Sequence, residues 1–103
     1  MIGQKFDENK EQWSLLPLVS VKEIIKVLQY GSHKYAPDSW QHLVNPNRRY
    51  YEALLRHITS WWEGEAHDKE SGLLHLAHAG ANVLFLLWFQ LQEKKEDENG
   101  NDL

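Results

Sequence analysis

A long apolar stretch near the C-terminus, residues 70–92, restricts the fold of this 103-residue chain more than any other segment. Large apolar side chains occupy nearly every side of it when it is drawn as a helix, so we expect it to be the central, most buried helix. His75, His78 and Asn82 interrupt the apolar run. These polar groups, and an apolar length of barely 18 residues from Gly72 to Phe89, favour a buried helix over a membrane span.

The sequence pattern of residues 21–30 predicts a shorter amphipathic helix. Ser20 followed by Glu23 is a capping-box pattern near its start, and Gly31 supplies a stop. Apolar residues recur at three- and four-residue steps, as in a helix packed on one side; they are Val21, Ile24, Ile25 and Leu28.

A further helix is predicted over residues 46–63. Asn45 is suited to cap it, Pro46 is tolerated at a first helical position, and Gly64 lies where the helix would end. The expected buried stripe of this helix consists of Tyr51, Leu54, Leu55, Ile58, Trp61 and Trp62.

Together these patterns predict an all-α fold, a small bundle of three main helices in one domain over residues 1–92. We expect residues 1–17 to form an extended arm that docks a few apolar side chains, and the acidic residues 93–103 to form a disordered tail. A chain this short has room for one small core. We therefore expect the bundle to be completed by oligomerisation, as a homodimer or homotetramer.

The composition excludes several classes of function. A net charge of -4, from 11 basic and 15 acidic residues, provides no basic field for a long nucleic acid. The absence of cysteine excludes disulfides and cysteine-based zinc sites. The N-terminus lacks the apolar core of a secretory signal, and no membrane partner is expected, so a cytoplasmic location fits best.

The polar residues of the apolar stretch predict a site. His75, His78 and Asn82 stand at i, i+3 and i+7, on one face of a helix. Burying them is costly unless they find partners, and the candidates are His57, Glu65, Asp68 and Glu70. Imidazole and carboxylate suit Mn²⁺ or Zn²⁺ and, with water, Mg²⁺. Two alternatives to a metal site stay open: a purely structural buried network, and helix capping by Asp68 or Ser71.

A loop over residues 32–46 carries Lys34, Tyr35 and Trp40 among turn-forming residues. Loops of this kind are typical of binding sites. The alternative is that Tyr35 and Trp40 only roof the core.

Four motifs, KFDENKEQWSLLP, VLQYGSHKY, RRYYEALLRH and GEAHDKESGLLHLAHAGANVLFLL, occur in this order over roughly residues 5–90. Together they resemble the phage dATP/dGTP diphosphohydrolase N-terminal domain family, related to the MazG-like all-α nucleotide pyrophosphohydrolases. The resemblance implies a MazG-like helical bundle that often pairs with another copy. It also implies hydrolysis of a (deoxy)purine nucleoside triphosphate to the monophosphate and pyrophosphate, with a divalent metal, Mg²⁺ or Mn²⁺, as cofactor.

The resemblance also implies roles for individual residues. The implied catalytic residues are His57, Glu65 and Asp68, and the implied metal ligands are Glu65, Asp68, His75, His78 and Asn82. The implied phosphate contacts are Lys34, Arg49 and Arg56, and the implied base-stacking residues are Tyr35 and Trp40.

One departure from the wider MazG-like pattern keeps two functions open. That group carries ExxE on one helix and ExxD on the next, whereas this chain has HAGAN, with His78 and Asn82, where ExxD would stand. The chain is therefore expected to be either a metal-dependent diphosphohydrolase with a different ligand set, or a non-catalytic phage protein that sequesters a nucleotide. A helical assembly module with structural histidines is the third hypothesis.

Overall fold

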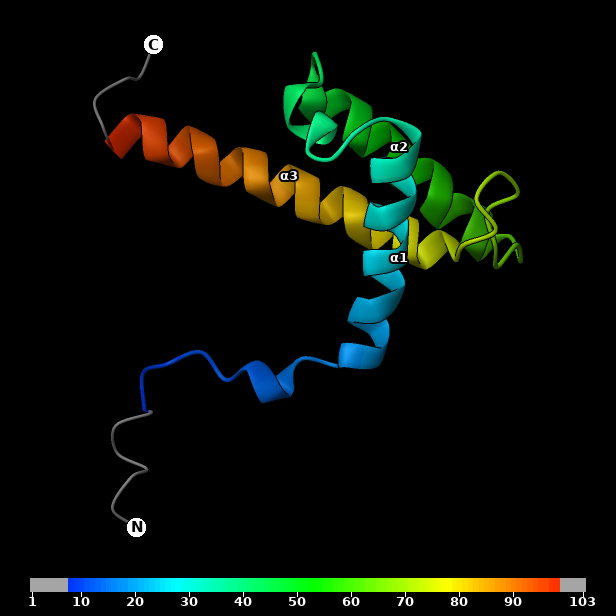
Figure 1. The fold of residues 1–103 in the computed structure, drawn as a ribbon, viewed down its shortest axis with the longest axis horizontal. Coiled ribbons are helices and arrows are strands. Elements are labelled where there is room, and N and C mark those ends of the chain that lie inside the picture. Colours follow the sequence, from blue (N-terminus) through cyan, green and yellow to red (C-terminus); the bar gives the residue numbers. More distant parts are fainter. Residues whose placement is uncertain (1–7, 99–103) are drawn as a thin grey trace.

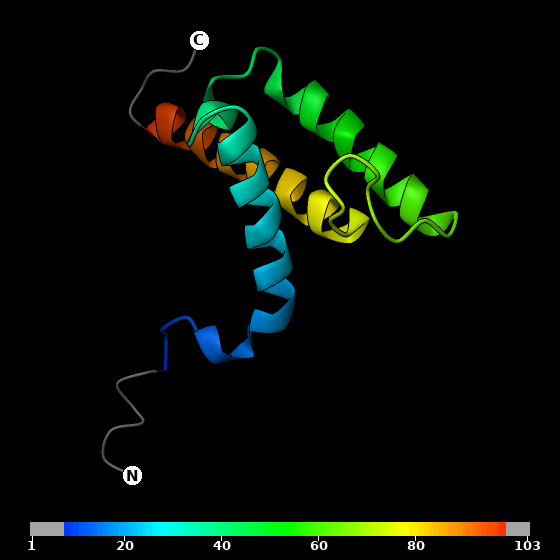
Figure 2. The ribbon, with the colours of Figure 1, turned by 45° about the vertical axis from the view of Figure 1, so that its right-hand side comes forward.

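The apolar stretch forms α3, His75–Glu98, which runs beside α2, Pro46–Trp62, while α1, Leu18–Lys34, crosses α3. Figures 1 and 2 show α2 and α3 as an antiparallel hairpin, with α1 and the N-terminal segment projecting to one side. This computed structural model describes residues 8–98, and within that range it contains helices, two short 3₁₀ turns and no strand longer than an isolated bridge. The predicted all-α fold with three main helices is confirmed.

Helix α1 is longer at both ends than predicted. It begins at Leu18, not at residue 21, because Pro17 takes the N-cap position and the Ser20 N–H already donates to the Pro17 carbonyl at 3.0 Å. It also continues through Gly31, whose carbonyl accepts a hydrogen bond from the Tyr35 N–H at 2.9 Å. A glycine ends a helix when it adopts a positive φ, and Gly31 does not.

Helix α2 ends within one residue of its predicted boundary. Pro46 occupies the first turn, and Gly64 follows with φ 103°, a conformation that favours glycine and ends the helix. Asn45 stands at the N-cap position as predicted, but its side chain makes no capping hydrogen bond and its φ is 54°.

Between α2 and α3 the chain makes a tight turn, so α3 begins at His75 and not at residue 70. His67 and Leu74 form an isolated antiparallel bridge, and the Asp68 N–H donates to the Leu73 carbonyl at 2.7 Å. Because Asp68 and Ser71 lie inside this turn, neither caps α3, and the capping alternative is wrong.

Helix α3 also ends later than predicted. Residues 93–98 are helical, so the expectation of a disordered tail is wrong for them, while residues 99–103 lie outside the described residues. Glutamate and lysine are good helix formers, and this propensity extends the helix beyond its apolar section.

The core is small and lies where α1 crosses α3. Val27, Ala77 and Ala81 are its buried members, and the partly buried side chains packed on them are Ile24, Leu28, Leu73, Leu74 and Phe85. Gly80 permits the crossing, because a Cβ at that position would lie 2.7 Å from the Ile24 Cδ1 atom. The buried part of α3 thus consists mainly of small residues.

Many large apolar side chains stay exposed, against expectation. On α2 the predicted stripe is only half-buried at Leu54 and Ile58, and it is exposed at Tyr51, Leu55, Trp61 and Trp62. The arm residue Trp13 is 76% exposed, so the expected docking of the arm is not observed. Two neighbouring helices cover only one face of α3, and its opposite face exposes Leu76, Val83, Leu84, Leu87 and Leu91. None of the helices within residues 8–98 combines the length and apolarity needed to cross a membrane.

Candidate metal centre and adjoining cavity

Three histidines and two carboxylates meet at the turn end of the α2–α3 hairpin. His57 comes from the last part of α2, Glu65 and Asp68 from the turn, and His75 and His78 from the first turn of α3. His75 is only 4% exposed. Six side chains were predicted to converge, and contacts join these five, whereas the sixth, Asn82, bonds to the backbone of α3.

A chain of hydrogen bonds joins His57, His75 and Glu65. The Nδ1 atoms of His57 and His75 are 2.8 Å apart, and His75 Nε2 lies 2.7 Å from Glu65 Oε1. The hydrogen bond from His75 lowers the pKa of Glu65, so its carboxylate is ionised and accepts the bond. Because His75 donates from Nε2 to this carboxylate, its Nδ1 accepts a hydrogen bond from the His57 Nδ1–H, and the Nε2 atom of His57 carries a lone pair.

Burial keeps His57 uncharged. Desolvation, followed by the nearby His78 and His75, lowers the pKa of His57 to about 4. Desolvation also lowers the pKa of His78. Neutral imidazoles at neutral pH are the form that binds metal ions, so no deprotonation is required of these two rings.

Ser71 organises the other half of the cluster. Its backbone N–H donates to Asp68 Oδ2 at 2.8 Å, and its hydroxyl lies 3.0 Å from the same oxygen and 2.7 Å from His78 Nε2. Desolvation raises the pKa of Asp68, but the hydrogen bonds from Ser71 outweigh it and the net pKa is lowered. The His78 ring is in turn stacked on His57, with centroids 4.4 Å apart.

His57, Asp68 and His75 could together hold a metal ion. Each offers one ligand atom, and these three atoms lie within 4.8 Å of one another. Ligand bonds of about 2.1 Å place neighbouring ligand atoms about 3 Å apart and opposite ones about 4 Å apart. The two Nδ1 atoms share a hydrogen bond at 2.8 Å, so an ion bound to both of them would take the place of the proton on His57 Nδ1, which would move to Nε2 of that ring. Two imidazoles and one carboxylate suit a divalent transition metal.

The remaining predicted ligands are placed differently. Glu65 accepts a hydrogen bond from the His75 ring and so fixes the orientation of that ring, as carboxylates beside metal-binding histidines do. His78 contacts Asp68 at 3.9 Å but does not belong to the three-residue group. Asn82 is buried, and its Nδ2 donates to the His78 carbonyl at 2.8 Å within α3.

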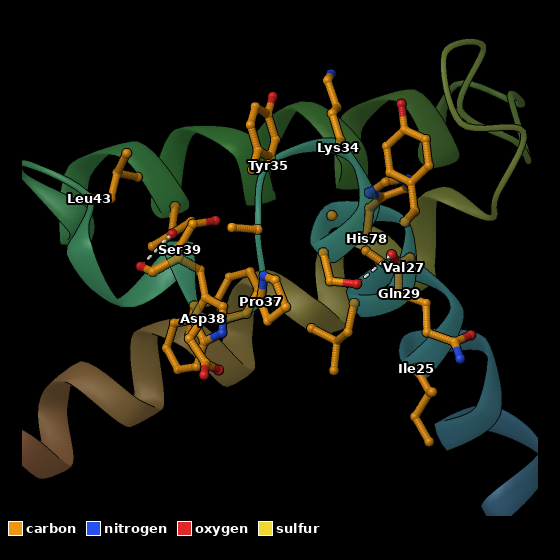
Figure 3. Close-up of a pocket in the computed structure, with 18 residues that line it drawn as sticks. Ile25, Val27, Gln29, Lys34, Tyr35, Pro37, Asp38, Ser39, Leu43 and His78 are labelled. Carbon is orange, nitrogen blue, oxygen red and sulfur yellow. Dashed lines mark hydrogen bonds between the residues drawn. The ribbon is translucent and has the colours of Figure 1, made fainter.

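A cavity of about 770 Å³ adjoins this cluster, between the end of α1, the following loop and α3 (Figure 3). His78 belongs both to the cluster and to the cavity lining. The predicted binding residues Lys34, Tyr35 and Trp40 also line it, whereas Arg49 and Arg56 do not. In Figure 3, Lys34 and Tyr35 extend from the same end of α1. Both arginines are exposed on α2.

Trp40 has a structural role as well. Its ring stacks on Phe85 with centroids 4.7 Å apart, and it meets Trp88 edge-on at 5.0 Å. Its carbonyl accepts a hydrogen bond from the Tyr50 hydroxyl at 2.8 Å. Trp40 therefore roofs the core, as the alternative proposed, while Tyr35 is 70% exposed and does not.

Sequence reasoning missed two residues of this region. Ser71 was predicted to act at most as a helix cap, although a Ser three residues after an Asp is a turn pattern that signals hydrogen bonding. Tyr30, which lines the cavity, lies inside a helix and carried no local signal.

Fold and site define an all-α domain with a histidine and carboxylate cluster beside a cavity. The family described as "dATP/dGTP diphosphohydrolase, N-terminal" matches residues 2–99, and the chain belongs to this family. Among curated proteins, a "dATP/dGTP diphosphohydrolase" of Salmonella phage PMBT28 is 34% identical over 98 residues, which are 95% of this chain and 33% of the relative. The chain thus spans about a third of that relative's length. No solved structure matches the chain.

Proposed function

We propose that this domain binds a purine deoxynucleoside triphosphate together with a divalent metal ion and hydrolyses it to the monophosphate and pyrophosphate. The observation that carries the proposal is the position of His78, which contacts Asp68 and Ser71 of the histidine and carboxylate cluster and also lines the cavity. A ligand in the cavity would therefore reach the metal centre. The family and the name of the phage relative support dATP and dGTP as the substrate class.

The cavity suits a nucleoside. Its volume of about 770 Å³ lies within the usual range for small-molecule sites, and its lining is mainly apolar and aromatic. Tyr35 offers an exposed ring on which a base would stack. Lys34 at the rim would contact phosphate oxygens.

His57, Asp68 and His75 would hold the ion, and Glu65 would keep His75 in position. A divalent ion there supplies charge neutralisation for phosphates and lowers the pKa of a bound water. Mn²⁺ fits two imidazoles better than Mg²⁺, which prefers oxygen ligands. Arg56 contributes to the lowered pKa of His57, so its charge acts on this end of α2, and it remains our candidate for a second phosphate contact.

A direct assay tests the proposal. The pure protein is incubated with each dNTP and Mg²⁺, Mn²⁺ or Co²⁺, while pyrophosphate release and bound nucleotide are measured. We expect turnover of dATP or dGTP that His75→Ala and Glu65→Ala abolish. His67→Ala is the matched control, because this exposed histidine lies in the same turn and outside the cluster. The proposal is refuted if the protein neither binds nor hydrolyses any of these nucleotides with any of the metals.

A second function, nucleotide binding without hydrolysis, is favoured by one observation. The metal group contains a single carboxylate, and Mg²⁺-dependent phosphate chemistry commonly relies on several. This function predicts stoichiometric binding of a purine nucleotide in the assay above, with no pyrophosphate released under any metal.

We also propose that a second copy of this chain covers the exposed apolar surface. The described part of the protein has no large hydrophobic side chain that is fully buried, and its buried hydrophobics are Val27 and three alanines. So small a core is a weak source of stability for an isolated chain of this size. Size-exclusion chromatography with light scattering should give a dimer or a tetramer, and a stable monomer at micromolar concentration would refute this part.

A further inference from the structure

Two donors on α1 and one acid on the turn meet at the rim of the cavity. Tyr30 and Lys34 stand one helical turn apart and both line the cavity. Glu70, which is not part of the lining, accepts a hydrogen bond from the Lys34 ammonium group.

The Glu70 carboxylate thus holds the position that an anion would take at the Lys34 ammonium group, which itself lies 5.8 Å from the centroid of the Tyr30 ring. The Lys34 and Glu70 side chains are 37% and 63% exposed, respectively, so this contact is made in water. Exposed ion pairs of this kind are weak and exchange readily with other charged groups. An anion that enters the cavity would compete with Glu70 for the same donors.

We propose that Tyr30 and Lys34 form the phosphate subsite of the cavity and that Glu70 occupies it until a substrate phosphate replaces the carboxylate. The inference rests on the proposed nucleotide binding and adds the position of the polyphosphate. Phosphate oxygens accept the same hydrogen bonds as a carboxylate and carry more charge. Glu70 is therefore an internal competitor that weakens the binding of every anionic ligand by one common factor.

The geometry gives the bound polyphosphate a direction. Lys34 and His78 line the same cavity, and His78 is hydrogen-bonded to Ser71 beside Asp68. A chain of phosphates that begins at Lys34 would extend toward the cluster of His57, Asp68 and His75. Glu70 lies two residues from Asp68, so one turn supplies both the competitor and a metal ligand.

Calorimetric titration of the whole chain with inorganic tripolyphosphate, without divalent metal, tests the subsite separately from hydrolysis. We expect Glu70→Gln to tighten binding about two- to fivefold, because an exposed ion pair has that strength. Tyr30→Phe should weaken binding, and Lys34→Met should weaken it further. In a Lys34→Met background, Glu70→Gln should lose most of its effect, since the two residues act on one another.

The control is Glu23→Gln, which removes the same charge from an ion pair with Lys26 on α1 and should leave binding unchanged. Circular dichroism confirms that each variant folds. Unchanged or weaker binding by Glu70→Gln, or an effect of Glu70→Gln that persists without Lys34, would overturn the inference. If tripolyphosphate binding follows the expected pattern but no dNTP is hydrolysed, the subsite stands and the proposed hydrolysis fails.

Discussion

The two ends of α3 differ in what their side chains contact. At the turn end, His75 and Asn82 are buried, and among the described residues no buried side-chain polar atom lacks a hydrogen-bond partner. At the other end, Leu84, Leu87 and Leu91 are about half exposed. The same helix therefore carries a polar cluster satisfied within one chain and an apolar face that one chain leaves uncovered. The difference indicates that the polar cluster is organised within one chain, whereas the uncovered apolar face is the surface that the proposed second copy would cover.

The largest effect on metal binding should come from a substitution in the polar cluster at the turn end of α3. Asp68→Ala removes the one carboxylate of the metal group and the partner of Ser71. Loss of a residue that only hydrogen-bonds to a metal ligand typically lowers metal affinity roughly 10- to 100-fold. We expect Mn²⁺ affinity to fall by more than this, because Asp68 would contact the ion directly. Calorimetric titration with Mn²⁺ measures this. Affinity within threefold of the wild type would show that Asp68 is not a ligand.

Glu65→Gln should have the next largest effect. The neutral amide oxygen accepts a weaker hydrogen bond from the His75 Nε2–H than the carboxylate does, so the ring is held less firmly. Mn²⁺ affinity should fall about 10- to 100-fold. The same titration checks it, with Glu63→Gln, an exposed acid at the end of α2, as the control.

Gly80→Ala tests the packing of α1 against α3, at the point between the two ends of α3 where the helices cross. The added Cβ would meet the Ile24 side chain at 2.7 Å from Cδ1 and 3.1 Å from Cγ1, so this side chain must move within the crossing of α1 and α3. Overpacking of this kind typically costs about 1–3 kcal/mol, which thermal unfolding would detect. The double variant Gly80→Ala with Ile24→Val should recover part of the loss, because it removes the methyl group in the way. A single variant as stable as the wild type would contradict the observed packing.

Lowering the pH should lower the free energy of unfolding through His57, which belongs to the polar cluster. The pKa of His57 is lowered to about 4 in the folded protein, from about 6.5 when unfolded, so the unfolded chain binds more protons between these values. This contribution to stability is present above pH 6.5 and is lost as the pH falls toward 4. After allowance for solvent screening we expect about 1 kcal/mol, or about 5 °C in melting temperature.

Metal-free protein melted at pH 4.5 and pH 7.5 checks this pH dependence. His57→Gln should reduce the difference between the two melting temperatures, because glutamine does not titrate between these pH values. An equal difference in that variant would assign the pH dependence to other groups.

The smallest effect on the site should come from the apolar end. Leu87→Asp places a charge on the exposed face of α3, far along the helix from the cluster. Mn²⁺ affinity should change by less than about twofold, as expected for distant, independent positions. The same variant should dissociate the proposed oligomer in light scattering. A loss of metal binding together with dissociation would show that a second copy completes the site.

Local chemistry made parts of this molecule predictable. Helix α2 was placed within one residue, because Pro46 and Gly64 act through their own backbone preferences. The convergence of His57, Asp68 and His75 was also predicted, since a short turn between two helices returns the chain on itself. Helix α1 was underestimated because a glycine such as Gly31 does not end a helix unless its φ becomes positive.

By itself, the sequence determined that the chain is helical, where its hairpin turns and which polar side chains stand beside that turn, because these features depend on neighbours along the chain. Only the tertiary structure decided that Glu70 reaches Lys34 and that a cavity opens at His78. The tertiary structure also decided which large apolar side chains stay exposed. These outcomes depend on where α1 crosses α3, a contact between segments about 50 residues apart that no local pattern encodes.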